Sequence, residues 1–346
     1  MPSVPFAHET TEYDLSVVIC TRNRAESLRE TLDHIVRDER EGIHVELVIV
    51  DNNSSDNTRE VALSFGKLIG IRYLREDRQG KCHALNRALD EGHLGKIVAF
   101  LDDDMSVERG WLKGVVESCE KWPDHDIFSG RSIAIFPPSD SLPPWARNNQ
   151  LHGWAFSVAD PGTEDRPLRR GSFPSGNHFW VRSSALTNGR RFPGLWLLPE
   201  PGLLLGLQED GCTGMWIGNV RVGHRVQMHL FDAEIILLRM VQFGKDSPYV
   251  QMPNPALFWK ASLFRNHPFL CLFFCAANAM RWRIKLASSF FKTSVEKRFL
   301  AKIIATVRLH DNWETVCHWR RIRQFVSDGQ IKHTSMEVRT LSRQHQ

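Results

Sequence analysis

The chain has 346 residues, of which 42% are hydrophobic and 24% are charged. This composition supplies enough apolar side chains for a packed core and is unlike that of a disordered chain. The 44 basic and 40 acidic residues leave a formal net charge of only +4, which gives no support for nucleic acid as a partner. The length suits one α/β domain with a C-terminal extension, and we place these at residues 14–235 and 236–346.

The cysteines and the amino-terminal residues bear on the cellular compartment. The seven cysteines form an odd, scattered set without a pair of CxxC motifs, which favours a reducing compartment. The first 14 residues include acidic side chains and lack an apolar run behind a basic start, so they do not resemble a secretory signal. We therefore expect a cytoplasmic protein.

From residue 15 to residue 128, short β-branched runs alternate with helical patterns. The predicted strands are Leu15–Cys20, Val45–Val50, Ile71–Leu74 and Ile97–Leu101. The predicted helices are Ser27–Val36, Thr58–Phe65, Gly80–Leu89 and Trp111–Cys119. This alternation is typical of a doubly wound sheet of parallel strands, which binds its ligands beyond the carboxyl ends of the strands.

Polar side chains follow the first two predicted strands. Thr21, Arg22 and Asn23 come after the first strand, and Asp51 and Asn53 follow the second. At the carboxyl edge of a sheet, such side chains can bind a base, a ribose or a phosphate. Asparagine and serine in these turns are nevertheless more often ordinary turn and capping residues.

Three adjacent carboxylates, Asp102, Asp103 and Asp104, come directly after the fourth predicted strand. Like charges this close together are costly unless a cation neutralises them, so a divalent ion with oxygen ligands is expected, and such an ion can bridge a pyrophosphate. The alternative is a solvated acidic turn that precedes the helix at Trp111.

A lysine stands at the start of the third predicted helix. Lys81 follows Gly80 directly, and a helix N-terminus combined with an ammonium group suits an anion such as a diphosphate. The alternative is an ordinary amphipathic helix with Lys81 in solvent.

Taken in order, the segments SVVICTRNR, VDNNSSDNT, GKCHALNRAL and FLDDDM resemble the family-2 glycosyltransferases with a GT-A fold. Two later segments extend the resemblance: residues 174–182 are similar to the acceptor-side SGxN segment, and residues 207–211 to the Glu-Asp pair. The resemblance implies an α/β fold of GT-A type, with a doubly wound, mostly parallel sheet and a C-terminal helical extension. It also implies inverting, metal-dependent transfer of a sugar from a nucleotide-diphosphate sugar, with a UDP-sugar favoured, to a hydroxyl of a glycan or lipid-linked glycan.

The resemblance gives roles to the matching residues. The residues expected at the substrates are Thr21, Arg22, Asn23, Asp51, Asn53, Lys81, Asn86, Asp102, Asp103, Gly176 and Asn177. Asp104 is the implied main ligand of Mg²⁺ or Mn²⁺, with Asp102 beside it. Asp210 is the implied general base for the acceptor hydroxyl, and Glu209 is its neighbour and substitute.

The resemblance also implies a metal-ligating histidine after the Glu-Asp pair. His224 is the candidate, His229 is its rival, and a histidine without a ligand role is the remaining alternative. The family usually places an amphipathic helix and a further strand between pair and histidine. This chain has only the compact, glycine-rich residues 211–220 after Asp210, which departs from the family pattern.

An apolar run at residues 269–280 is followed by a basic and aromatic stretch at residues 281–323. The run is shorter than the roughly 20 apolar residues that a membrane-spanning helix needs. We expect a helix that lies in the membrane interface, with contacts drawn from residues 255–323, at the inner face of the membrane. The alternative is a core helix with a solvated basic face.

Two other classes of protein are the alternatives to a glycosyltransferase. A carbohydrate-binding or nucleotide-sugar-binding protein of the same fold would lack turnover, but the carboxylates at 102–104 and 209–210 are all present. A nucleotidyltransferase commonly has a glycine-rich loop after its first strand, and residues 21–24 contain no glycine.

Overall fold

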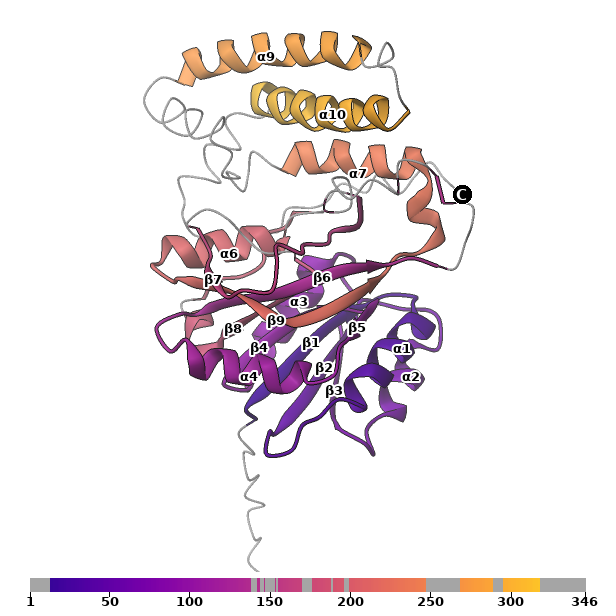
Figure 1. The fold of residues 1–346 in the computed structure, drawn as a ribbon, viewed down its shortest axis with the longest axis vertical. Coiled ribbons are helices and arrows are strands. Elements are labelled where there is room, and N and C mark those ends of the chain that lie inside the picture. The colour runs from indigo at the N-terminus through magenta and orange to yellow at the C-terminus, as the bar shows by residue number, and fades with distance from the viewer. Residues whose placement is uncertain are drawn as a thin grey trace, which may run out of the picture.

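The computed structural model describes residues 13–137, 142–143, 146, 153, 155–169, 176–187, 189–195, 199–246, 268–288 and 295–317. These residues form an α/β fold, in which a mixed β-sheet has helices on both faces. Three C-terminal helices lie in succession beyond the sheet (Figure 1).

The first half of the sheet is parallel, and it confirms the four predicted strands. Its strands are β1 (Leu15–Thr21), β2 (Val45–Asp51), β3 (Gly70–Arg75) and β4 (Ile97–Asp102), in the spatial order β3-β2-β1-β4. The connecting helices are α1 (Ala25–Val36), α2 (Thr58–Ser64) and α3 (Lys81–Glu91). Strands β1 and β2 are buried along most of their length because helices cover both faces, as their continuous apolar runs predict.

The second half of the sheet is mixed in direction. Its elements are β5 (Met105–Val107), α4 (Trp111–Lys121), β6 (Ile127–Ile135), β7 (Arg166–Pro167), β8 (His178–Arg182), α6 (Pro199–Glu209) and β9 (Gly214–Arg225). Strand β8 is antiparallel to β4 and β6, β9 is parallel to β6, and β5 and β7 are antiparallel to β9. The spatial order continues as β4-β8-β6-β9-β5.

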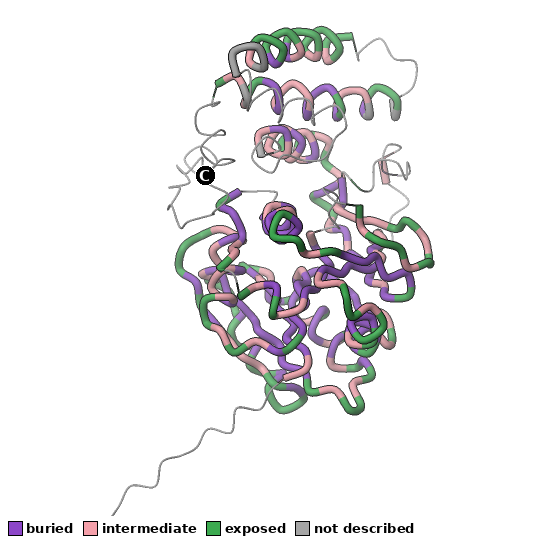
Figure 2. Tube along the Cα trace, turned by 90° about the vertical axis from the view of Figure 1, so that its left-hand side faces the viewer, coloured by how far each residue is buried: buried purple, intermediate pink, exposed green. Residues whose placement is uncertain are grey.

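Two apolar clusters hold the sheet between its helices. One cluster joins β1 and β2 to α1, α2 and α4, and the other joins the opposite face of the same strands to α3 and α6. Strands β1, β2 and β4 are almost wholly buried, β3 and β7 are more exposed, and the outer faces of the helices are exposed (Figure 2). The expected fold class, an α/β fold with a mostly parallel sheet and C-terminal helices, is confirmed.

The C-terminal helices are α7 (Ala233–Asp246), α9 (Pro268–Ser288) and α10 (Val295–Cys317), and α10 packs against both of the others. The predicted domain boundary at residue 235 falls inside α7. Ile236 and Met240 of this helix share a buried cluster with Phe156 and Val226, so α7 packs directly on the α/β domain. In the described part of the chain, no helix has the length and apolar character needed to cross a membrane.

Candidate functional site

The carboxyl ends of β1, β2 and β4 bring polar side chains to one edge of the sheet. The parallel register sets Thr21 opposite Asp51 and Cys20 opposite Asp102. Residues predicted from three separate strand ends therefore lie side by side. Arg22 follows Thr21 and is exposed at this edge.

Asp51 is buried at the end of β2 and accepts two hydrogen bonds. The backbone N–H of Ser54 donates to its Oδ1 at 2.7 Å, and the Tyr73 hydroxyl donates to its Oδ2 at 2.5 Å. Burial and the bond to Asp51 raise the pKa of the Tyr73 phenol. Asp51 thus shapes the turn that carries Asn53 toward the site.

Asn23 and Asn53 both adopt the left-handed backbone conformation, with φ values of 50° and 61°. Asparagine tolerates this conformation better than most residues do. The side-chain oxygen of Asn23 accepts from the Ser55 N–H at 2.7 Å, so the turns after β1 and β2 are joined to each other. The Asn53 oxygen accepts a hydrogen bond from Arg75.

The carboxylates of Asp103 and Asp104 are buried and held by Arg24. One guanidinium nitrogen of Arg24 lies 2.6 Å from Asp103 Oδ1, and another lies 2.9 Å from Asp104 Oδ2. Thr21 donates to Asp103 Oδ2 at 2.7 Å. The predicted acidic group is therefore not a solvated turn, because its last two members are turned into the protein.

His224 lies against Asp104. Met105 of β5 pairs with His224 of β9, and this register places the imidazole Nε2 3.4 Å from Asp104 Oδ2. The other ring nitrogen, Nδ1, is 2.6 Å from the carbonyl oxygen of Phe156, which orients the ring. His229 is exposed in the short 3₁₀ helix Met228–Phe231, so the structure brings His224 and not His229 to the carboxylates.

Burial and charge separate the two buried carboxylates. Burial raises the pKa of Asp103, and the neighbouring Asp104 charge adds to the rise, while Arg24 opposes it. Burial also acts on Asp104, but its hydrogen bond to His224 and the Arg24 charge outweigh this and lower its pKa. The pKa of Asp104 is thus held below that of Asp103.

The chemistry of this group suits a divalent cation. Asp104 Oδ1 is buried and has no hydrogen-bond partner among the described residues, which is costly for an anion unless a cation binds there. Carboxylate oxygens suit Mg²⁺ and Mn²⁺, and an imidazole nitrogen is a common further ligand. In the conformation described, however, no three acidic, histidine or cysteine side chains of the described residues converge as a ready metal site.

Lys81 connects Asp102 to a second buried carboxylate. Its ammonium nitrogen lies 2.6 Å from Asp102 Oδ1 and 2.5 Å from Glu200 Oε1. Burial lowers the pKa of Lys81, but the two carboxylates outweigh it and raise the pKa overall. Burial raises the pKa of Glu200, with Lys81 opposing the rise. Lys81 is therefore paired within the site rather than free in solvent.

Gly176 and Asn177 lie between Asp102 and Glu200. A Cβ atom on Gly176 would come within 3.0 Å of Glu200 Oε2, so the backbone there packs directly on that carboxylate. The Asn177 carbonyl accepts from the Asp102 N–H at 3.2 Å, and its side chain donates to the Ser157 carbonyl at 2.8 Å. The segment expected at the acceptor therefore reaches the site.

The structure does not bring Asp210 and Glu209, the predicted base and its substitute, to the carboxylates at 102–104. Arg190 binds both carboxylate oxygens of Asp210 at 2.7 Å, and the Glu209 side chain is 62% exposed. Helix α6 begins at the site with Pro199 and Glu200 and ends at Glu209. Asp210 comes ten residues after Glu200, and at a rise of ~1.5 Å per residue it lies about 15 Å from Glu200 along the helix axis.

The strand register shows where the C-terminal end of α6 lies. Gly214, which begins β9, pairs with Ile127 at the start of β6. Ile127 pairs with Val181, and Val181 pairs with Val98 near the start of β4. Asp210, four residues before Gly214, is therefore near the amino edge of the sheet, opposite to the carboxylates at 102–104.

Sequence reasoning missed Glu200, although the chain held a signal for it. Between Glu200 and His224 lie helix α6 and strand β9, the elements that the family pattern places between its acidic pair and its histidine. The short gap between Asp210 and His224 favours an acidic position earlier in the chain. Glu200 is followed by Pro201, so only one carboxylate stands at this position.

Asn86 is the other predicted residue that serves a different contact. Its side-chain nitrogen donates to the Phe192 carbonyl at 2.9 Å, and its oxygen accepts from the Phe192 N–H at 2.8 Å. Both ends of the amide are therefore used to attach the segment at 189–195 to helix α3.

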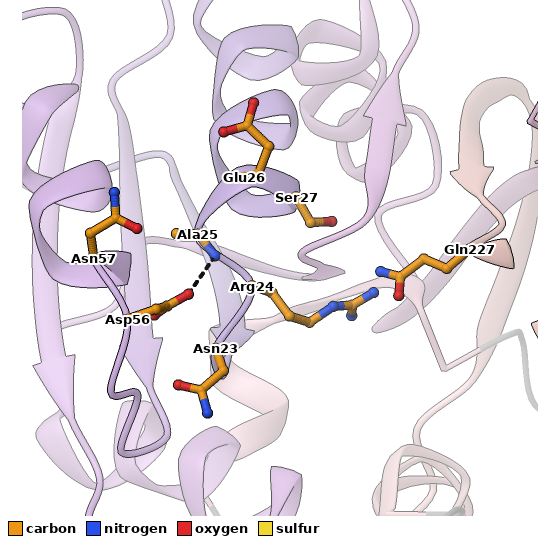
Figure 3. A pocket seen from close by; sticks show the side chains of 8 residues that line it. All are labelled: Asn23, Arg24, Ala25, Glu26, Ser27, Asp56, Asn57 and Gln227. Carbon is orange, nitrogen blue, oxygen red and sulfur yellow. Dashed lines mark hydrogen bonds between the residues drawn. The ribbon is translucent and has the colours of Figure 1, made fainter. Parts of the chain in front are cut away.

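An open pocket of about 420 Å³ lies beside Arg24. It is lined by Asn23, Arg24, Ala25, Glu26, Ser27, Asp56, Asn57 and Gln227 (Figure 3). Asp56 accepts from the Ala25 N–H at 3.1 Å and so binds the first turn of α1. The Gln227 side chain points toward the Arg24 guanidinium.

Comparisons with known proteins agree with this arrangement. Residues 16–186 match the family model Glycosyl transferase family 2. Glycosyltransferase AglE of Haloferax volcanii is 33% identical over 100 residues, covering 29% of this chain and 33% of that protein. Glucosyl-dolichyl phosphate glucuronosyltransferase of the same organism is 29% identical over 122 residues, covering 34% of this chain and 38% of that protein. Each match thus spans only about a third of the relative's own length.

One solved structure shares the fold at low sequence identity. S. aureus TarS 1-349 in complex with UDP is 15% identical, with a TM-score of 0.50 over 89% of this chain and 91% of that one. The family model covers β1 to β4 and their loops, which carry the carboxylates at 102–104. The chain therefore belongs to glycosyl transferase family 2, with its family domain at residues 16–186.

Proposed function

We propose that the protein transfers a glycosyl unit from a nucleotide-diphosphate sugar to an acceptor hydroxyl, with inversion at the anomeric carbon and with Mg²⁺ or Mn²⁺ as cofactor. The observation that carries this proposal is the meeting of the acidic group, His224, Lys81 and Glu200 at one edge of the sheet. The family domain supports it.

The donor occupies the ends of β1, β2 and β4. Asp51, Asn53, Asn23 and Thr21 lie at the base and ribose, with Arg22 exposed at their rim, and Lys81 and the helix α3 N-terminus lie toward the diphosphate. The complex of S. aureus TarS 1-349 with UDP supports a UDP-sugar as the donor. A hydrolysis screen of UDP-, GDP- and TDP-sugars checks this, and a clear preference for a donor without uracil contradicts it.

Asp104 and His224, with Asp102 nearby, would hold the metal, which stabilises the negative charge on the departing diphosphate when bound. The unpartnered Oδ1 of Asp104 fits this role. Asp103, which Thr21 and Arg24 already bind, keeps the loop in place.

Glu200 takes the role of general base in place of Asp210. A general base must lie within hydrogen-bond reach of the hydroxyl that it deprotonates, and Glu200 lies against the acceptor-side Gly176. Its burial raises its pKa, which makes it a better proton acceptor than an exposed carboxylate. One base opposite the leaving diphosphate leads to inversion.

Matched amide variants test the base. Glu200→Gln should lower the transfer rate by about 10²–10⁴ with little change in donor affinity, because the base acts only as attack proceeds. Asp210→Asn should transfer at close to the wild-type rate. The donor dissociation constant and the single-turnover rate are measured for each. Wild-type transfer by Glu200→Gln, or a large loss confined to Asp210→Asn, contradicts the assignment; absence of turnover in the wild type with intact donor binding supports a binding protein instead.

The acceptor is a glycan or a lipid-linked glycan. The similarity to glucosyl-dolichyl phosphate glucuronosyltransferase of Haloferax volcanii supports a lipid-linked acceptor. Such an acceptor requires the enzyme to work at a membrane, and for this chain we place that work at the cytoplasmic face. Helix α9 is the surface that suits it.

The outer face of α9 is apolar and flanked by basic side chains. Its apolar stripe consists of Phe273, Ala277, Met280 and Ile284. Phe273 and Ile284 are 68% and 64% exposed, while α10 covers the opposite face of the helix. The basic residues beside the stripe are Arg281, Arg283 and Lys285. This pattern suits a helix that lies in the interface of an anionic bilayer. The rest of the predicted contact region, residues 255–267, 289–294 and 318–323, lies outside the described residues.

Vesicle sedimentation tests the membrane contact. The full-length protein should sediment with phosphatidylserine-containing vesicles and be released by salt, and the variant Phe273→Ser/Met280→Ser/Ile284→Ser should stay in solution. The variant Leu63→Ser/Leu68→Ser replaces exposed apolar residues near helix α2 and is the matched control. Equal sedimentation of both variants contradicts the role of α9.

A further inference from the structure

Arg24 is a charged side chain that binds one oxygen of each buried carboxylate, next to the unpartnered Oδ1 of Asp104 that suits a metal. Its guanidinium bridges the carboxylates of Asp103 and Asp104 at 2.6 and 2.9 Å. The side chains of these two aspartates are only 4% and 10% exposed, whereas that of Arg24 is 33% exposed. The cation therefore closes the site from its solvent side.

Each carboxylate of the acidic group has a cationic partner before any metal arrives. Lys81 pairs with Asp102, while Arg24 serves both Asp103 and Asp104. His224 and Arg24 approach the same oxygen of Asp104, Oδ2. A divalent ion bound to Asp104 would lie close to the Arg24 guanidinium, which contacts the same carboxylate. The two cations would repel each other.

The Arg24 side chain can move away from the carboxylates into a neighbouring pocket. The pocket beside it is open and includes the carboxylates of Glu26 and Asp56 (Figure 3). With its amide oxygen turned to the guanidinium, Gln227, which lines this pocket, accepts hydrogen bonds from Arg24 Nε and from the terminal nitrogen that also binds Asp104. A long side chain that is one-third exposed can change its rotamer toward this pocket without disturbing the core.

We propose that Arg24 is the resident counter-cation of Asp103 and Asp104, and that a divalent ion binds in competition with it. The free protein then binds the metal weakly, because Arg24 has to leave the carboxylates first. A donor diphosphate brings negative charge that can accept the released guanidinium, so the metal and the donor bind together. This inference rests on the proposed function for its metal.

Mn²⁺ binding to the full-length protein without nucleotide tests the competition. The free Mn²⁺ signal in electron paramagnetic resonance gives the dissociation constant for the wild type, Arg24→Gln, Arg24→Lys and Arg29→Gln. Arg24→Gln should bind Mn²⁺ at least tenfold more tightly than the wild type, and Arg24→Lys should fall between them, since one ammonium group bridges two carboxylates less well. Arg29 lies in α1, the helix that follows Arg24, and pairs with Glu26 instead, so Arg29→Gln controls for the lost charge and should match the wild type.

Thermal melting shows whether each variant is folded, and Arg24→Lys carries the test if Arg24→Gln is not. Equal or weaker Mn²⁺ binding by the folded Arg24 variants overturns the competition, while transfer that still requires Mn²⁺ leaves the proposed function standing. If no variant binds Mn²⁺ and chelation leaves transfer unchanged, the metal assignment fails and the competition fails with it.

Discussion

His178 makes the stability of the domain depend on pH in a way that can be calculated. It is the first residue of β8 and is fully buried, and the Trp111 indole N–H donates to its Nε2 at 2.8 Å. Burial lowers its pKa to about 3. The folded protein therefore keeps this imidazole neutral, whereas the unfolded chain protonates it near its usual pKa of about 6.5.

The sign follows from the depressed pKa. The contribution of His178 to stability is fully present above pH ~6.5 and is lost progressively as the pH falls toward the folded-state pKa, because only the unfolded state takes up the proton. The slope approaches ~1.4 kcal/mol per pH unit, and the loss between pH 7 and pH 5 comes to about 2 kcal/mol.

Urea unfolding followed by tryptophan fluorescence at several pH values between 5 and 7 measures this loss. His178→Gln retains an acceptor for Trp111 and cannot take up the proton, so its stability should change by about 2 kcal/mol less than that of the wild type over this range. His93→Gln replaces an exposed histidine and is the matched control. The reasoning is refuted if His178→Gln loses as much stability as the wild type between pH 7 and pH 5.

Two glycines give further predictions. Gly176→Ala should lower the transfer rate while leaving the melting temperature nearly unchanged, because its Cβ would press on the Glu200 carboxylate at 3.0 Å. Single-turnover kinetics and melting curves measure the two effects. An unchanged transfer rate counts against the placement of Glu200. Gly130→Ala should destabilise the fold by ~1–3 kcal/mol or more, because its Cβ would overlap the Val220 carbonyl oxygen and lie 2.8 Å from the His178 ring. Urea unfolding measures the loss. Stability equal to the wild type would show that the backbone can relax at Gly130, where the register between β6 and β9 shifts.

The sequence by itself determined the parallel half of the fold and one side of the site. Apolar runs that alternate with helical patterns suffice to predict β1 to β4, because β1, β2 and β4 are buried on both faces and each helix covers one face. Parallel strands joined by helices must all end at the same edge, so Thr21, Asp51 and Asp102 had to meet.

Two assignments needed the tertiary structure because local patterns do not contain them. The sequence does not show whether the start or the end of α6 lies at the site, and both ends carry acidic residues. The fold places Glu200 at the carboxyl edge of the sheet and leaves Asp210 about 15 Å away, paired with Arg190. His224 and His229 are five residues apart in the chain, and only the β5–β9 register places one of them on Asp104.

The pairing of charges was decided in the same way. Arg24 and Asp103 are separated by 79 positions, and Lys81 and Glu200 come from helices on opposite sides of the family domain's C-terminal limit. Which cation neutralises which carboxylate depends on distances that arise only after the sheet is assembled, since the interaction falls off with separation and grows with burial. The sequence therefore showed that the acidic group needs a cation, and the fold determined that Arg24 fills that need first.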